Sequence, residues 1–173
     1  AAWRAGAGGG GGAGGAPQSA ETLLEAARRL GYAIGAVTTA RVTHATPAAF
    51  TAHSAEREDE EDLAPQQLEL GLDVLLGGGR RHWEAPSRAD GRDLVGEARA
   101  RGVEVVGTRA ELERAATGSS PVLGLFNDSH VSYALDRRGS LLQPGRGAAS
   151  PTEEPTLAQM AAAAVAHLRQ CRL

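Results

Sequence analysis

The segment GYAIGAVTTARVTHATPAAFTAHSAER, residues 31–57, changes from an apolar strand pattern to a helical pattern within a few residues. Its first part, residues 32–39, is short, apolar and partly β-branched, which predicts a buried strand. Thr46 and Pro47 then form a helix-start signal, because Thr is a favoured N-cap and Pro fits the first helical position. A buried strand that runs into a helix is typical of α/β proteins.

The rest of the chain repeats this alternation of short apolar runs and amphipathic segments. Further strands are predicted at residues 72–76, 103–106 and 122–126. Helices are predicted at residues 19–30, with Ser19 as the N-cap, and at residues 65–70, 92–101, 110–116 and 155–172, with a loop at 139–155. This order favours an α/β fold, with a mainly parallel central sheet and helices on both faces. Such sheets bind ligands beyond the carboxyl ends of their strands.

Composition excludes several classes of function. The 173 residues carry a formal net charge of −3, which excludes a strongly basic nucleic-acid binder. Cys171 is the only cysteine, so neither an internal disulfide nor a Cys-based zinc module can form. No apolar run approaches the ~18 residues of a transmembrane helix. Residues 1–17 are Gly-rich and predicted to be flexible, and residues 18–173 are predicted to form one partial α/β domain.

The loop after the first strand carries side chains suited to phosphate chemistry. His44 and Thr46 lie where the chain enters a helix N-terminus, which favours anions. Arg57 follows Thr46 by 11 residues, about three helical turns, and a guanidinium can bind two phosphate oxygens.

Each of these residues also has a structural interpretation that the spacing leaves open. On spacing alone, a Thr at the position of Thr46 is more often an N-cap, and a His at the position of His44 is more often a hydrogen-bonded loop residue. Arg57 lies in EREDEED, residues 56–62, which is predicted to be a solvated acidic loop where it would form a surface ion pair. His53 is predicted to be a structural residue inside the helix.

Five collinear segments resemble the alkaline phosphatase family. They are GAVTTARVTHATPAAFTAHSAER, DVLLGGGRRHW, VLGLFND, SYALDRR and PTLAQMAAAAVAHL. The resemblance implies hydrolysis of phosphate monoesters through a phosphoserine intermediate, with two zinc ions and one magnesium ion. It implies that Thr46 is a magnesium ligand, that His44 lies near the magnesium and its waters, and that Arg57 binds phosphate and stabilises the transition state.

The sequence also departs from the family pattern. The family's serine segment and its zinc-ligand segments have no counterpart here, and Ser19 lacks the flanking residues of the nucleophile. The chain is therefore expected to be the middle piece of a longer enzyme and to have no phosphatase turnover by itself. Phe126 and Glu154 match part of the calcium site of animal-type members, but Asn127 stands where these have Glu, so calcium binding stays open.

The resemblance further implies a homodimer and an extracellular, periplasmic or membrane-anchored location for the full-length protein. The alternative is a non-catalytic remnant of the family that serves as a binding or interaction module. A reading frame that extends in both directions would favour the enzyme, and a frame that ends at these boundaries would favour the remnant.

Overall fold

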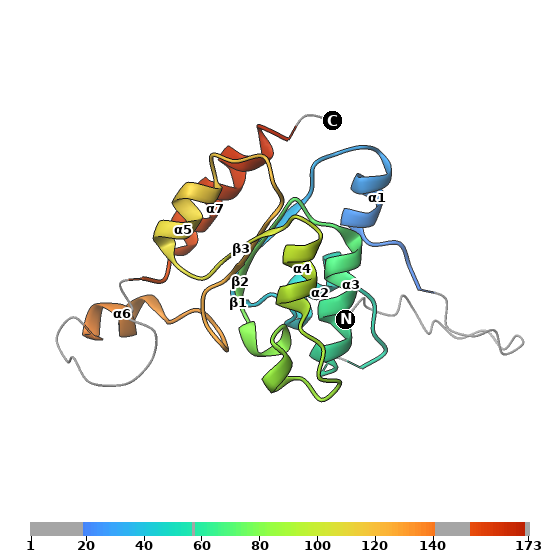
Figure 1. Cartoon of the computed structure of the whole chain (residues 1–173), viewed down its shortest axis with the longest axis horizontal. Coiled ribbons are helices and arrows are strands. Elements are labelled where there is room, and N and C mark those ends of the chain that lie inside the picture. The colour runs from blue at the N-terminus through green and yellow to red at the C-terminus, as the bar shows by residue number, and fades with distance from the viewer. Residues whose placement is uncertain (1–18, 57, 141–152, 172–173) are drawn as a thin grey trace, which may run out of the picture.

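The structure is a computed structural model that describes residues 19–56, 58–140 and 153–171. A four-stranded parallel sheet forms its centre (Figure 1). Its strands are β1 (Gly35–Arg41), β2 (Val74–Gly78), β3 (Glu104–Val106) and β4 (Val122–Leu125), in the spatial order β1-β2-β4-β3. The prediction of a mainly parallel α/β sheet is confirmed.

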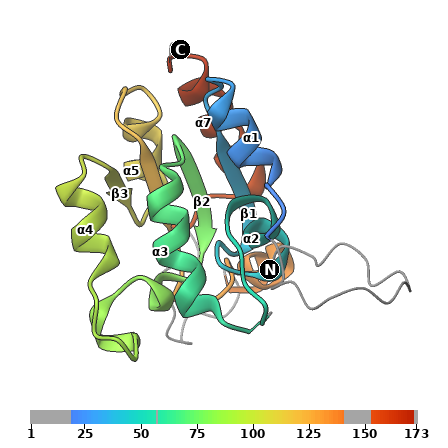
Figure 2. The ribbon, with the colours of Figure 1, turned by 90° about the vertical axis from the view of Figure 1, so that its right-hand side faces the viewer.

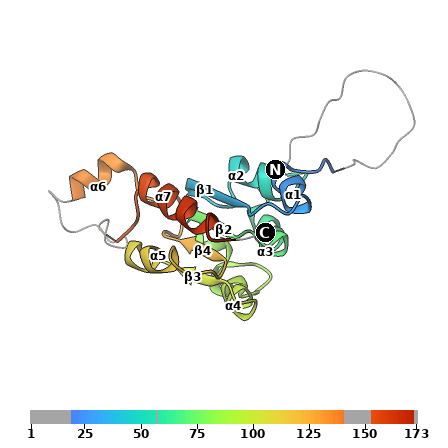
Figure 3. The same ribbon diagram turned by 90° about the horizontal axis from the view of Figure 1, so that it is seen from above.

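Helices cover both faces of this sheet, as seen from above in Figure 3. The described helices are α1 (Leu23–Arg29), α2 (Ala45–Thr51), α3 (Glu60–Leu70), α4 (Leu94–Ala100), α5 (Arg109–Ala115), α6 (Ala134–Ser140) and α7 (Leu157–Leu168), with 3-10 turns η1 (Arg80–His82) and η2 (Ala85–Ser87). Figure 2 shows α3 and α4 side by side in front of the strands, and α5 and α7 lie on the opposite face.

Strand alternation produces the two apolar layers. Leu75 and Leu123 point to the face covered by α1, α3 and α4, and they pack in a cluster with Trp83. Val74 and Leu76 point to the other face, which α5 and α7 cover. Because successive side chains of a strand alternate between faces, one short apolar strand supplies both cores.

Several predicted boundaries are wrong, and local hydrogen bonds explain them. The N-cap of α1 is Thr22 rather than Ser19, because Thr22 and Glu25 form a reciprocal capping box. The N-cap of α2 is His44 rather than Thr46, and α2 ends at Thr51. Helix α2 is therefore shorter than three turns after Thr46.

Two further elements differ from the sequence prediction. Helix α3 begins at Glu60, so the predicted acidic loop is half helical and Pro65 lies inside the helix rather than at its start. Helix α6 occupies residues 134–140, a segment for which no helix was predicted. The predicted flexible segment 1–17 and most of the predicted loop 139–155 lie outside the described residues.

A close backbone approach joins the ends of β2 and β4. The amide of Gly79 donates to the carbonyls of Asn127 and Ser129 over 2.9 and 2.8 Å. A Cβ at Gly78 would overlap the carbonyl oxygen of Ser129, and Gly79 has a φ of +94°. The glycine run thus lets the loop after β4 lie against the carboxyl ends of β1 and β2.

Candidate active site

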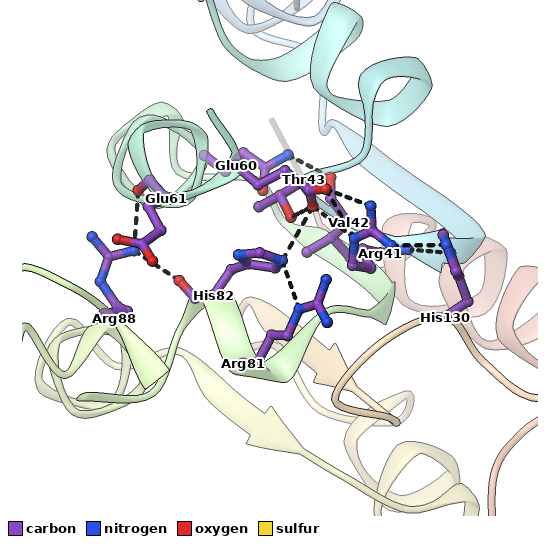
Figure 4. Close-up of polar contacts among 10 residues, drawn as sticks. Arg41, Val42, Thr43, Glu60, Glu61, Arg81, His82, Arg88 and His130 are labelled. Atoms are coloured by element: carbon purple, nitrogen blue, oxygen red, sulfur yellow. Dashed lines mark hydrogen bonds and ion pairs between the residues drawn. The ribbon is translucent and has the colours of Figure 1, made fainter. Parts of the chain in front are cut away.

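A charged cluster lies beyond the carboxyl ends of β1 and β2 (Figure 4). Arg41 is the last residue of β1, and Glu60 is the first residue of α3. The Nε of Arg41 donates to both carboxylate oxygens of Glu60 at 2.9 Å, and Nη2 approaches Oε1 to 2.5 Å. Thr43, which is fully buried, donates from Oγ1 to Oε2 of Glu60 over 2.6 Å. The carboxylate of Glu60 therefore joins the end of β1, at Arg41, to the loop after it, at Thr43.

The electrostatics of the cluster favour an ionised Glu60. Burial alone would raise the pKa of this carboxyl, but the hydrogen bonds from Arg41 and Thr43 outweigh that effect and hold the pKa at about 2. The same hydrogen bond raises the pKa of Arg41. The pair is consequently charged at neutral pH.

Two histidines border this ion pair in the neutral form. The Nη1 of Arg41 lies 2.8 Å from Nε2 of His130, which must accept because a guanidinium only donates. Burial and the neighbouring charge of Arg41 lower the pKa of His130. His82 lies with Nε2 3.4 Å from Oε2 of Glu60, and burial lowers its pKa as well.

The structure places two of the three predicted site residues. His44 is half-buried at the N-cap of α2, and its ring meets that of His130 edge to face with centroids 5.5 Å apart. Thr46 is exposed in the first turn of α2. Arg57 lies outside the described residues. The structure thus brings His44 to the charged cluster, with Thr46 two residues further along the same loop and helix.

The structure also contains polar residues that sequence reasoning missed, namely Arg41, Glu60, His82 and His130. Glu60 is 6% exposed, although it belongs to a run of acidic residues that resembles a solvated surface. No local signal marks it, because neighbouring Glu and Asp residues have the same chemistry. The signal available for Arg41 was its place at the carboxyl end of a predicted strand.

His53 lies two residues beyond α2 rather than inside it. Its Nδ1 lies 2.6 Å from Oγ of Ser19, and its Nε2 lies 2.8 Å from Oε1 of Glu25. Its backbone amide and carbonyl bond to the side chain of Gln66. These contacts tie the residues after α2 to α1 and α3.

The residues present fit only part of a magnesium shell. Magnesium takes about six ligands, mostly oxygens. Thr46 offers an exposed hydroxyl and His44 an imidazole, whereas the carboxylate of Glu60 is engaged by Arg41 and Thr43. Within residues 19–56, 58–140 and 153–171, no group of three or more His, Cys, Asp or Glu side chains could hold a metal ion.

Glu154 and Asn127, for which calcium binding stayed open, bond to each other in the structure. Glu154 is 1% exposed, and its Oε1 accepts from Nδ2 of Asn127 over 2.7 Å. Its Oε2 accepts from the amide of Ser132 over 2.9 Å. Two N–H donors thus satisfy this buried carboxylate. A cavity of about 380 Å³ lies beside it and is bordered by Arg80, Gly107 and Phe126, among others.

Comparison with known proteins identifies the family. The sequence profile of the alkaline phosphatases matches residues 11–172. The alkaline phosphatase of Schizosaccharomyces pombe is 39% identical over 126 residues, which cover 66% of this chain and 24% of that protein. The repressible alkaline phosphatase of Saccharomyces cerevisiae is 39% identical over 137 residues, which cover 67% of this chain and 24% of that protein.

The fold agrees with this assignment. The crystal structure of Thermus thermophilus alkaline phosphatase superimposes with a TM-score of 0.74 at 41% identity, covering 85% of this chain and 28% of that one. The chain belongs to the alkaline phosphatase family. It spans about a quarter of the length of the curated relatives described above. In the part of the chain that the structure describes, no helix is long and apolar enough to cross a membrane.

Proposed function

We propose that this chain is the middle part of an alkaline phosphatase that hydrolyses phosphate monoesters through a phosphoserine intermediate. The family match over residues 11–172 carries this proposal. The position of His44 and Thr46 supports it, because both follow the carboxyl end of a parallel strand, where α/β sheets bind their ligands.

Three residues have proposed roles. The hydroxyl of Thr46 holds magnesium, and the imidazole of His44 lies near this ion and its waters. Arg57 binds two oxygens of the phosphoryl group in its planar guanidinium and stabilises the charge that develops there. The bound metal ions, two zinc and one magnesium, supply Lewis-acid activation and charge neutralisation. The serine nucleophile and the zinc ligands belong to parts of the full-length enzyme beyond this chain.

We also propose that the full-length enzyme is a homodimer and lies outside the cell, in a periplasm or on a membrane anchor. These proposals rest on family membership alone.

Phosphatase assays of the 173-residue chain and of the longer protein that contains it test the proposed function. The substrate is p-nitrophenyl phosphate, and MgCl2 and ZnCl2 are present. We expect no turnover by the purified 173-residue chain, and turnover by the longer reading frame that contains it. In that longer protein Arg57→Ala should lower kcat/KM roughly 10–100-fold, the value of a hydrogen bond to a charged group. Arg114→Ala, an exposed arginine in α5, is the matched control and should have no effect.

Two results would contradict the proposal. An inactive, correctly folded longer protein loaded with both metals would favour the non-catalytic alternative. Turnover that follows the purified 173-residue chain and disappears in Arg57→Ala would show that the isolated chain is itself an enzyme.

A further inference from the structure

We propose that Glu60 and Arg41 are positioning residues that hold the loop from Thr43 to Thr46 in the geometry that phosphoryl transfer requires. This inference rests on the proposed function and extends it to two residues for which that function assigns no contact with phosphate or metal. It starts from a pair that is 19 positions apart in sequence and joined by three contacts of 2.9 Å or less.

The first connection runs from Glu60 directly to the loop. Its Oε2 accepts from the hydroxyl of Thr43 over 2.6 Å, in addition to the hydrogen bond from Arg41. Thr43 is 0% exposed, so its hydroxyl has no access to water as an alternative partner. Glu60 therefore fixes the backbone immediately before His44.

The second connection runs through Arg41 to the imidazole of His44. The guanidinium that Glu60 holds also donates to Nε2 of His130 over 2.8 Å. The ring of His130 in turn meets the ring of His44 at an interplanar angle of 69°. Figure 4 shows Arg41 between Glu60 and His130, so that one guanidinium bridges α3 and the loop after β4.

The physical cost of this arrangement argues for a positioning role. Arg41 and Glu60 have side chains that are only 14% and 7% exposed. The desolvation of two such charges cancels much of their attraction, so that apolar residues of similar volume would give about the same stability. What apolar residues would not give is a set of directed hydrogen bonds that fixes the orientation of Thr43 and His130.

Hydrogen–deuterium exchange in the 173-residue chain tests the positioning itself. Glu60→Gln keeps the shape of the side chain and removes its charge. We expect at least tenfold faster exchange of the amides of His44 and Ala48, which donate to the carbonyls of Arg41 and His44. The amide of Met160 in α7 serves as an internal reference for global unfolding, and its exchange should rise less than that of the two loop amides.

Two further variants complete this experiment. Glu69→Gln makes the same chemical change at an exposed position of α3 and should leave all these amides unaffected. Thr43→Val removes only the hydroxyl that bonds to Glu60 and decides the question if Glu60→Gln does not fold. The proposal would be overturned if the amides of His44 and Ala48 exchanged equally fast in wild type and in Glu60→Gln or Thr43→Val. It would also be overturned if exchange of the Met160 amide in α7 rose by the same factor.

Kinetics of the longer protein test the consequence for catalysis. With p-nitrophenyl phosphate, Glu60→Gln should lower kcat at least tenfold while KM changes less than threefold, and it should raise the MgCl2 concentration for half-maximal activity. A residue that merely supports stability would lower the yield of folded protein without this split. If folded Glu60→Gln kept the wild-type kcat and magnesium dependence, the proposal that this positioning matters for catalysis would be overturned.

The two experiments separate the two proposals. If the wild-type longer protein has no phosphatase activity, the proposed function fails, whereas the exchange experiment still confirms or overturns the positioning of the loop.

Discussion

Glu60 accepts hydrogen bonds from Arg41 on both carboxylate oxygens, each 2.9 Å from Nε, and thereby joins the first turn of α3 to the end of β1. Burial of the carboxylate is tolerated because Thr43 supplies a further donor. Arg41, Thr43 and Glu60 therefore form one hydrogen-bonded unit, in which the charge of Glu60 depends on pH.

This unit predicts a specific pH dependence of stability. The pKa of Glu60 is about 2 in the folded chain, below its ordinary value of 4.5. Its stabilising contribution is therefore fully present above about pH 4.5 and is lost as the pH falls through 2. We expect wild type to exceed Glu60→Gln by roughly 3 kcal/mol in free energy of unfolding at pH 6, with the difference narrowing toward pH 2.5.

Urea denaturation at several pH values measures this difference. Glu69→Gln, on the exposed side of the same helix, should show no comparable difference at any pH. A difference between wild type and Glu60→Gln that stays constant from pH 6 to pH 2.5 would be inconsistent with the charge-based explanation.

Gly78→Ala should destabilise the chain by steric overlap. A Cβ at this position meets the carbonyl of Ser129, so the loop after β4 must move away from β2. Overpacking of this kind costs about 1–3 kcal/mol or more. The midpoint of urea denaturation should fall for Gly78→Ala but stay close to wild type for Gly118→Ala, where the nearest atom is 3.4 Å from the added Cβ. Equal midpoints would argue against the close approach.

Leu76→Ala should be among the most damaging apolar truncations. Leu76 is 0% exposed in the central strand β2, where it packs between the sheet and the α5–α7 layer. Such truncations cost about 2–5 kcal/mol, which corresponds to a decrease in Tm of at least ~4 °C. Leu135→Ala, at a side chain that is 79% exposed, is the control and should leave Tm almost unchanged. Similar Tm values for both variants would contradict the assigned core.

Asn127→Asp should destabilise the segment that precedes α7. Asn127 donates to the buried carboxylate of Glu154, which lies 27 residues away in sequence. An aspartate at position 127 would place a second negative charge in direct contact with that carboxylate. We expect a loss of about 1–3 kcal/mol in free energy of unfolding, measured by urea denaturation in the presence of EDTA. The neighbouring exposed change Asp128→Asn should have little effect, and equal stability of both variants would exclude the proposed role of the amide.

The sequence alone determined the sheet and its parallel class, and it predicted a site beyond the carboxyl end of the first strand. The apolar runs that became β1, β2, β3 and β4 are short and bounded by Gly, Pro or polar residues, and periodicity detects such runs well. The collinear segments from GAVTTAR to the final helix determined the family in the same way, because the order of segments and their local residue patterns can be read directly from the linear sequence. The roles of His44 and Thr46 come from the same resemblance and stay predictions.

Tertiary structure alone decided which polar side chains act together. Glu60 is chemically the same as Glu61 and Glu58, and only the angle at which α3 meets β1 turns it toward Arg41 and Thr43. His130 reaches this cluster because Gly78 lets the loop after β4 lie against the sheet. Local propensity cannot predict these contacts, since each joins residues 17 to 89 positions apart and forms in a buried environment that exists only in the folded chain.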